Sequence, residues 1–95
     1  MKLPKTFRVG RKKFVVTEVD RLPRDHRGIV KHSAAHVHIA RGHRWGTYSP
    51  RQRHETLLHE MTHAVLRSMD DRFNTEDFVQ PFAEKLAKAI MSARF

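Results

Sequence analysis

The 95-residue chain contains no cysteine. This absence excludes disulfide bonds, thiolate nucleophiles and zinc sites with sulfur ligands. Histidine, aspartate and glutamate remain as the residue types that could hold a metal ion, and the chain has 8 histidines. A chain without disulfides also fits a reducing compartment.

Long apolar segments are missing as well. No stretch approaches the roughly 20 apolar residues of a membrane span. The basic segment Met1-Lys2-Leu3-Pro4-Lys5 is not followed by the apolar run of a signal peptide. We therefore expect a cytoplasmic protein that has no membrane partner.

Carboxylates are scarce in this chain. Its 10 aspartates and glutamates stand against 19 lysines and arginines, which gives a formal net charge of +9. Such an excess favours a polyanionic partner, either nucleic acid or an acidic protein. The basic residues are spread along the whole chain, so a basic surface without a specific partner is the alternative.

The length supports one domain, residues 1–95, and the first half has the β-branched residues and turn signals of strands. The predicted strands cover residues 7–9, 14–19, 29–31 and 36–40. Gly10-Arg11 is the predicted turn between the first two strands. Gly28 is expected to take a positive φ in the loop before the third.

Two helices are predicted in the second half. Ser49 is the expected cap of the first, and Gln52 completes a capping box. This helix is expected to end near Met69, and a second one, capped by Asn74 or Thr75, to continue to near the end of the chain. The order predicts a small α+β domain, with a short antiparallel or mixed sheet packed on the two helices.

The first predicted helix carries His59-Glu60-Met61-Thr62-His63. Helical residues four apart lie about 40° apart around the axis and about 6 Å along it, so both imidazoles can reach one metal ion. Glu60 is rotated by about 100° from His59, toward a water on that ion rather than the ion itself. Two ligands and a general base so arranged indicate a zinc hydrolase. Two surface histidines and a solvated glutamate are the alternative interpretation.

Catalytic zinc needs a third protein ligand and an open position for water. No third histidine follows at a useful spacing, so a carboxylate is expected. Glu76 lies at the edge of the second helix's apolar stripe, whereas Asp77 and Glu84 lie on its polar side. Glu76 is therefore the predicted third ligand, with Asp77 and Asp70 as alternatives. The stripe, which we expect to be buried, consists of Phe78, Val79, Phe82, Ala83, Leu86 and Ile90.

Further expectations surround this site. Pro81 lies within the second helix, where a kink or a later start would change which residues face the site. Glu55, one turn before His59, could orient the His59 ring. The strand at residues 36–40 could align an extended peptide by strand addition. Four side chains are unranked candidates for stabilising an oxyanion: His36, His38, His43 and Tyr48.

These segments together resemble a known family, the minimal gluzincins. The resemblance rests on Gly28, Ile39 and residues 56–65, which include the two histidines and Glu60. In that family the next helix carries an acidic ligand followed by apolar residues three and six positions later. Glu76, Val79 and Phe82 fit this pattern. The similar proteins are phage-borne and related to repressor-cleaving peptidases of mobile elements and of the radiation response.

The resemblance covers residues 14–86 and implies a minimal zincin-like fold. It implies a Zn²⁺ cofactor held by His59, His63 and Glu76, with Glu60 as the catalytic residue. It also implies a protein or peptide substrate, met in the host cytoplasm if the protein is phage-encoded. Pro81 and the strong positive charge depart from the family pattern.

Two functions follow as hypotheses. The first is a zinc-dependent metallopeptidase that hydrolyses peptide bonds through a zinc-activated water, with Glu60 as general base. The alternative is a basic module of the same fold that binds nucleic acid or an acidic protein, in which zinc is structural and proteolysis is absent. Arg41-Gly42-His43-Arg44-Trp45 favours the alternative, because it combines basic residues with an aromatic ring for base stacking.

Overall fold

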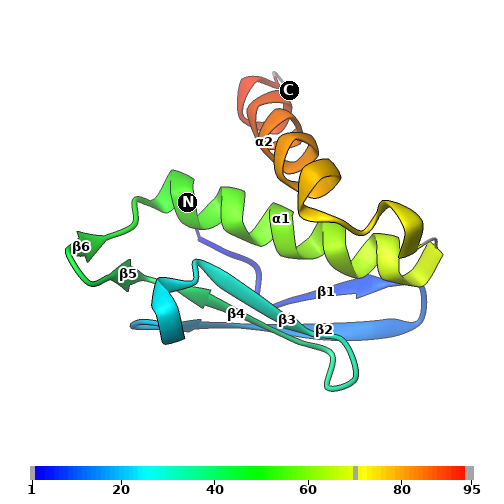
Figure 1. Cartoon of the computed structure of the whole chain (residues 1–95), viewed down its shortest axis with the longest axis horizontal. Coiled ribbons are helices and arrows are strands. Elements are labelled where there is room, and N and C mark those ends of the chain that lie inside the picture. The colour runs from blue at the N-terminus through cyan, green and yellow to red at the C-terminus, as the bar shows by residue number, and fades with distance from the viewer. Residues whose placement is uncertain (1, 70, 94–95) are drawn as a thin grey trace.

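A four-stranded mixed sheet forms one side of the molecule (Figure 1). The structure is a computed structural model and describes residues 2–69 and 71–93. The strands are β1 (Thr6–Val9), β2 (Lys12–Val19), β3 (Gly28–Lys31) and β4 (His36–Ala40), in the spatial order β1-β2-β4-β3. β2 and β4 are parallel, whereas the pairs β1–β2 and β3–β4 are antiparallel. The predicted strands are confirmed.

The strand order corrects the expectation that a peptide could add to residues 36–40. β4 is paired with β2 on one side and with β3 on the other, so it has no free edge. The free edge on this side of the sheet belongs to β3. Pairing of strands that are distant in the sequence decides which strand is outermost, and the local pattern of residues does not contain that information.

Helix α1 (Pro50–Met69) lies across one face of the sheet (Figure 1). It begins with the predicted capping box. The Gln52 backbone N–H donates to Ser49 Oγ over 3.1 Å, and the Ser49 backbone N–H donates to Gln52 Oε1 over 2.8 Å. These bonds satisfy donors that the first turn of a helix leaves without intrahelical partners. A small hairpin of β5 (Gly42–His43) and β6 (Gly46–Thr47) precedes the helix.

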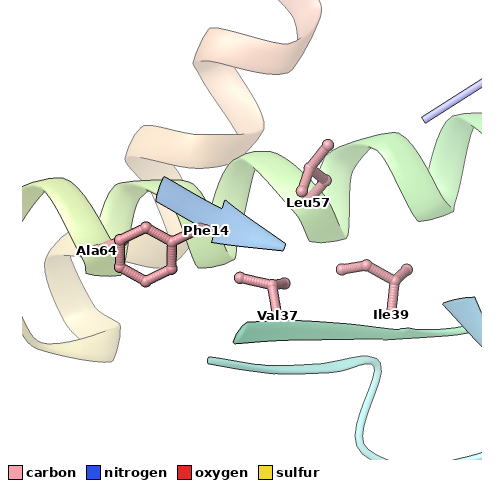
Figure 2. Packing of buried hydrophobic residues seen from close by; sticks show 5 residues of the cluster. All are labelled: Phe14, Val37, Ile39, Leu57 and Ala64. Carbon is pink, nitrogen blue, oxygen red and sulfur yellow. The ribbon is translucent and has the colours of Figure 1, made fainter. Parts of the chain in front are cut away.

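The core lies between the sheet and α1. Five side chains, each at most 2% exposed, form it: Phe14, Val37, Ile39, Leu57 and Ala64 (Figure 2). Burying one large apolar side chain contributes about 1.5–3 kcal/mol, so this cluster fixes α1 on the sheet. Side chains alternate along a strand, so His36 and His38 point to the opposite, outer face of the sheet.

Helix α2 (Glu76–Ser92) packs on the side of α1 that faces away from the sheet, which makes α1 the middle layer (Figure 1). It is continuous through Pro81. Its buried side chains are Val79, Ala83 and Ala87, whereas Phe78, Phe82, Leu86 and Ile90 are exposed. The expectation of one buried stripe is therefore wrong for the four larger residues. None of the described helices is long and apolar enough to cross a lipid bilayer.

Gly28 is required by packing and not by its backbone angles. Among the described residues, positive φ occurs at Gly10, Arg24, Asp25 and Ala35. The expectation of a positive φ at Gly28 is therefore wrong. A Cβ atom at position 28 would lie 2.7 Å from Thr56 Cγ2 and 3.1 Å from Glu60 Cγ. The missing side chain allows β3 to approach α1 closely.

We predict that Gly28→Ala lowers the free energy of unfolding by about 1–3 kcal/mol, because the added methyl group overpacks the contact between β3 and α1. Urea unfolding followed by circular dichroism measures this loss. Gly46→Ala is the matched control, because a Cβ atom there would meet only His43 ring atoms at 3.9 Å. Equal losses in the two variants would contradict close approach as the reason for Gly28.

Candidate metal centre

Three polar side chains converge on one side of α1. His59 and His63 lie one helical turn apart, and their Nε2 atoms are separated by 3.2 Å. One ligand atom from each of His59, Glu60 and His63 lies within 4.8 Å of the others. The spacing of the motif on a regular helix produces this convergence. This group could hold a metal ion.

Glu76, the first residue of α2, adds a second carboxylate to the group. Its Oε2 atom lies 3.0 Å from His59 Nε2, and its Oε1 atom lies 2.6 Å from His63 Nε2. The two helices therefore bring together the three side chains that the sequence singled out as ligands. Their role as ligands remains a prediction.

Among the other carboxylates considered from the sequence, Glu55 and Glu84 have polar partners other than the two histidines, although both line the same cleft as Glu76. Glu84 accepts a hydrogen bond from Gln80 Nε2 over 2.6 Å. Glu55, expected to orient the His59 ring, instead forms an ion pair with Arg51 at 3.6 Å. Asp77 is exposed, and within the described part of the chain it makes no ion pair with either histidine of the site. Asp70 lies outside the described residues.

The donor geometry fits a tetrahedral ion. Two ligand nitrogens that are each about 2.0–2.1 Å from a tetrahedral zinc ion lie about 3.3 Å apart, and the two Nε2 atoms are 3.2 Å apart. Two imidazoles and one carboxylate are also a ligand set that suits zinc, and three protein ligands leave a fourth position open. The residues present therefore fit a zinc ion with one open coordination position.

Asn74 orients the His63 ring. Its Oδ1 atom lies 2.6 Å from His63 Nδ1, and its Nδ2 atom donates to Asp71 Oδ1 over 3.4 Å. Because an amide oxygen only accepts, Nδ1 of His63 is the donor. In the neutral ring Nε2 then carries the lone pair that a metal ligand needs, and it faces His59 and Glu76. The sequence shows Asn74 only as a helix cap, since no spacing rule connects it with His63.

Glu60 is the buried carboxylate of the site, at 7% exposure. Burial raises the pKa of Glu60 from 4.5 to about 7; the His63 imidazole opposes this rise, and Glu76 adds to it. A carboxyl group with a pKa near neutrality can both accept and return a proton. Burial also lowers the pKa of His59, against the opposing effect of Glu76, and this favours the neutral imidazole that binds metals.

A cleft of about 460 Å³ opens beside these residues. Its lining includes Gly28 of β3, His59 and Glu60 of α1, and Glu76 of α2. His26 and Arg27, from the segment before β3, also line it. Nothing in their spacing marks them as site residues in the sequence, because only the pairing of β3 with β4 brings this segment alongside α1.

The four oxyanion candidates from the sequence do not line this cleft. His36 and His38 lie on the outer face of the sheet, where His36 Nε2 is 2.8 Å from Thr17 Oγ1, so the expectation is wrong for both. His43 packs on Tyr48 near the small hairpin, with ring centroids 5.0 Å apart.

No protein-family model matches this chain, and neither a curated protein nor a solved structure matches it. Any functional assignment therefore depends on the geometry and chemistry of the cleft.

We predict that Asn74→Ala weakens divalent-metal binding by about 10–100-fold, because the His63 ring loses the partner that orients it. Competition for Zn²⁺ with a chelating indicator measures the affinity. Thr75→Ala is the matched control, because Thr75 is the N-cap residue of α2 but makes no side-chain capping hydrogen bond. Unchanged affinity in Asn74→Ala would show that the hydrogen bond to His63 does not support metal binding.

Proposed function

We propose that this protein is a zinc-dependent peptidase. The observation that carries the proposal is the convergence of His59 Nε2, His63 Nε2 and the Glu76 carboxylate, at separations of 2.6, 3.0 and 3.2 Å. Glu60 lies beside them as a buried carboxylate, and His59, Glu60 and Glu76 line an open cleft. Metal ligands, a general base and room for a substrate are the parts that metal-assisted hydrolysis needs.

His59, His63 and Glu76 are the residues that would hold the ion. A bound zinc ion lowers the pKa of a coordinated water to about 7 and polarises a carbonyl group. Glu60 accepts a proton from the attacking water and returns it to the leaving amine. Its burial supports this role, because a pKa of about 7 matches proton transfer in both directions near neutral pH.

The free edge of β3 offers a place for the substrate backbone. Gly28 at the start of β3 lines the cleft and lies next to Thr56 and Glu60. An extended peptide that pairs with this edge would therefore run alongside the general base. Arg27, which precedes Gly28 and also lines the cleft, supplies a cation near the peptide on this side. The substrate class that fits is an extended protein segment or peptide.

We predict about one zinc ion per wild-type chain after purification in metal-free buffer, as measured by mass spectrometry of the metal. His63→Ala and Glu76→Ala are each expected to lose the ion or bind it far more weakly, because only two protein ligands remain. Asp77→Asn is the matched control for Glu76, since Asp77 is the next residue of α2 and is exposed. A folded wild type that takes up no zinc on titration would refute the proposed site.

Glu60→Gln separates catalysis from metal binding. The variant keeps the shape of the side chain and is expected to retain zinc, while cleavage of a quenched-fluorescence peptide library falls by about 10²–10⁴-fold. Undiminished cleavage by Glu60→Gln would rule out this residue as the general base. Zinc binding without cleavage in the wild type would favour the binding module described next.

The outer face of the sheet supports binding of nucleic acid as a second candidate function. Arg8 of β1 and Lys13 of β2 are directly opposite each other in the register, and both point away from α1. Like charges at such positions are destabilising, so packing does not explain the pair. Among the described residues neither side chain has a carboxylate within ion-pair distance. A phosphate backbone would neutralise both charges.

For this second function we predict that the double variant Arg8→Gln/Lys13→Gln weakens binding to duplex DNA and reduces the slope of log affinity against log salt by about 1–2. Fluorescence anisotropy of a labelled duplex at several salt concentrations measures both quantities. Lys85→Gln, which removes an exposed charge on α2, is the control. Equal effects of the variants would point to net charge instead of a defined face.

A further inference from the structure

Carboxylates gather around the cleft beside the candidate metal centre. The whole chain has only 10 aspartates and glutamates against 19 lysines and arginines, yet four glutamates line this one cleft: Glu55, Glu60, Glu76 and Glu84. Among the described residues of the lining, Arg27 alone is a lysine or arginine. The cleft therefore carries a charge opposite in sign to that of the chain as a whole.

Two of these carboxylates have no part in the proposed hydrolysis, in which Glu60 is the general base and Glu76 a metal ligand. Glu55 lies four residues before His59 on α1, and Glu84 lies eight residues after Glu76 on α2. Along the helix axes these separations are about 6 Å and about 12 Å. Glu55 and Glu84 therefore line the cleft at a distance from the metal centre.

The present partners of Glu55 and Glu84 leave both charges available to a ligand. Glu84 is exposed and accepts a hydrogen bond from the neutral amide of Gln80 over 2.6 Å. Glu55 forms its ion pair with Arg51 over 3.6 Å, and 62% of the Arg51 side chain is exposed. An exposed pair of this kind contributes little to stability, so a cation in the cleft can compete for Glu55.

The buried carboxylate of the cleft also has room for a positive neighbour. Glu60 is only 7% exposed, and within the described part of the chain its carboxylate makes no hydrogen bond and no ion pair. Burial of an unpaired carboxylate is unfavourable, and the nearby Glu76 adds to the rise in the pKa of Glu60. A cationic group of a ligand in the cleft would stabilise the ionised form of these carboxylates.

We propose that the cleft selects peptides that carry an arginine or lysine side chain within about two to four residues of the bond to be cleaved. This selection rests on the peptidase function proposed above, whose substrate class it names. An extended peptide advances about 3.3 Å per residue, so the separations along α1 and α2 correspond to about two and four residues of substrate. Carboxylates bind guanidinium and ammonium groups through charge-assisted hydrogen bonds, which are stronger than neutral ones.

The net charge of +9 opposes this selection only weakly. Charges more than about 8 Å apart are largely screened at physiological ionic strength, whereas a cleft lined by one sign of charge concentrates the local field. The guanidinium of Arg27 lies over the Tyr48 ring, 5.1 Å from its centroid. Arg27 belongs to the segment before β3 and not to the two helices, so the basic side chain of the substrate is expected to point toward α1 and α2.

Cleavage of matched quenched-fluorescence peptides by the zinc-loaded full chain tests the proposal. The peptides differ only in one residue, arginine, glutamine or glutamate, placed in turn at each position up to four residues from the cleaved bond. At one or more positions kcat/KM is expected to be at least about tenfold higher with arginine than with glutamine, and lowest with glutamate. The double variant Glu55→Gln/Glu84→Gln is expected to bring the ratio of arginine to glutamine close to one.

Asp20→Asn is the matched control, because it removes a carboxylate whose side chain is 95% exposed and lies outside the cleft. This variant is expected to keep the wild-type ratio. Glu84→Lys is expected to shift the preference toward the glutamate peptide, which a purely structural role of Glu84 would not cause. Equal cleavage of the three peptides by the wild type would overturn the selection and leave the peptidase function standing.

A binding measurement separates failure of the selection from failure of the peptidase function. Fluorescence anisotropy of the labelled peptides with Glu60→Gln, which is expected to retain zinc, measures recognition without cleavage. Binding of the arginine peptide is expected to be about tenfold tighter than that of the glutamine peptide, and Glu55→Gln/Glu84→Gln in the same background is expected to remove the difference. This result supports the selection even where the wild type cleaves no peptide, whereas equal affinities for the three peptides would overturn it.

Discussion

The burial of Leu57 and Ala64 against Val37 and Ile39 sets the rotation of α1 about its axis. Once the apolar side of α1 packs on the sheet, the helical repeat determines where every other side chain of α1 lies around the helix axis. The side chains of His59 and His63 then lie on the side of α1 that meets Glu76 at the start of α2. The position of the polar cluster is thus a consequence of apolar packing on a different side of the same helix.

The polar cluster is also a connection between the two helices. Glu76 of α2 contacts His59 and His63. Asn74, in the segment before α2, accepts a hydrogen bond from Nδ1 of His63. A domain of this length buries only about 60–68% of the surface of its unfolded chain, so such connections matter for its stability. An ion held by both helices would stabilise the fold in addition to any chemistry that it performs.

Small residues at packing contacts have two consequences in this fold. Neighbouring elements approach each other closely, and larger apolar residues beside the contact stay partly exposed. Gly28 allows β3 to lie against Thr56 and Glu60, and all three residues line the cleft. Ala83 and Ala87 allow α2 to lie close on α1. The larger apolar residues of α2 are only partly covered, with exposed fractions of 36–46% at Phe78, Phe82, Leu86 and Ile90. The small residues that let α2 lie on α1 therefore leave the larger apolar residues of this helix partly exposed.

The sequence by itself determined the features that depend on neighbouring residues along the chain. These are the strands, the capping box at Ser49, the two helices, the α+β class, and the placement of His59, Glu60 and His63 on one helix side. Helical periodicity also singled out Glu76. This residue lies at the edge of the apolar stripe of its helix, as His59 and His63 lie at the edge of theirs. Such features follow from local bonding and from the repeat of 3.6 or 2 residues, which any segment carries with it.

Tertiary structure alone decided the features that depend on contacts between distant segments. The interior position of β4, the partnership of Asn74 with His63, and the packing role of Gly28 each need two segments to be placed in space. The outward direction of Phe78 and Phe82 has the same cause, since a helix pattern shows how wide an apolar stripe is but not how much of it a neighbour covers. The repeat of apolar residues is a property of one helix or strand, whereas the burial of those residues depends on which second element packs against them.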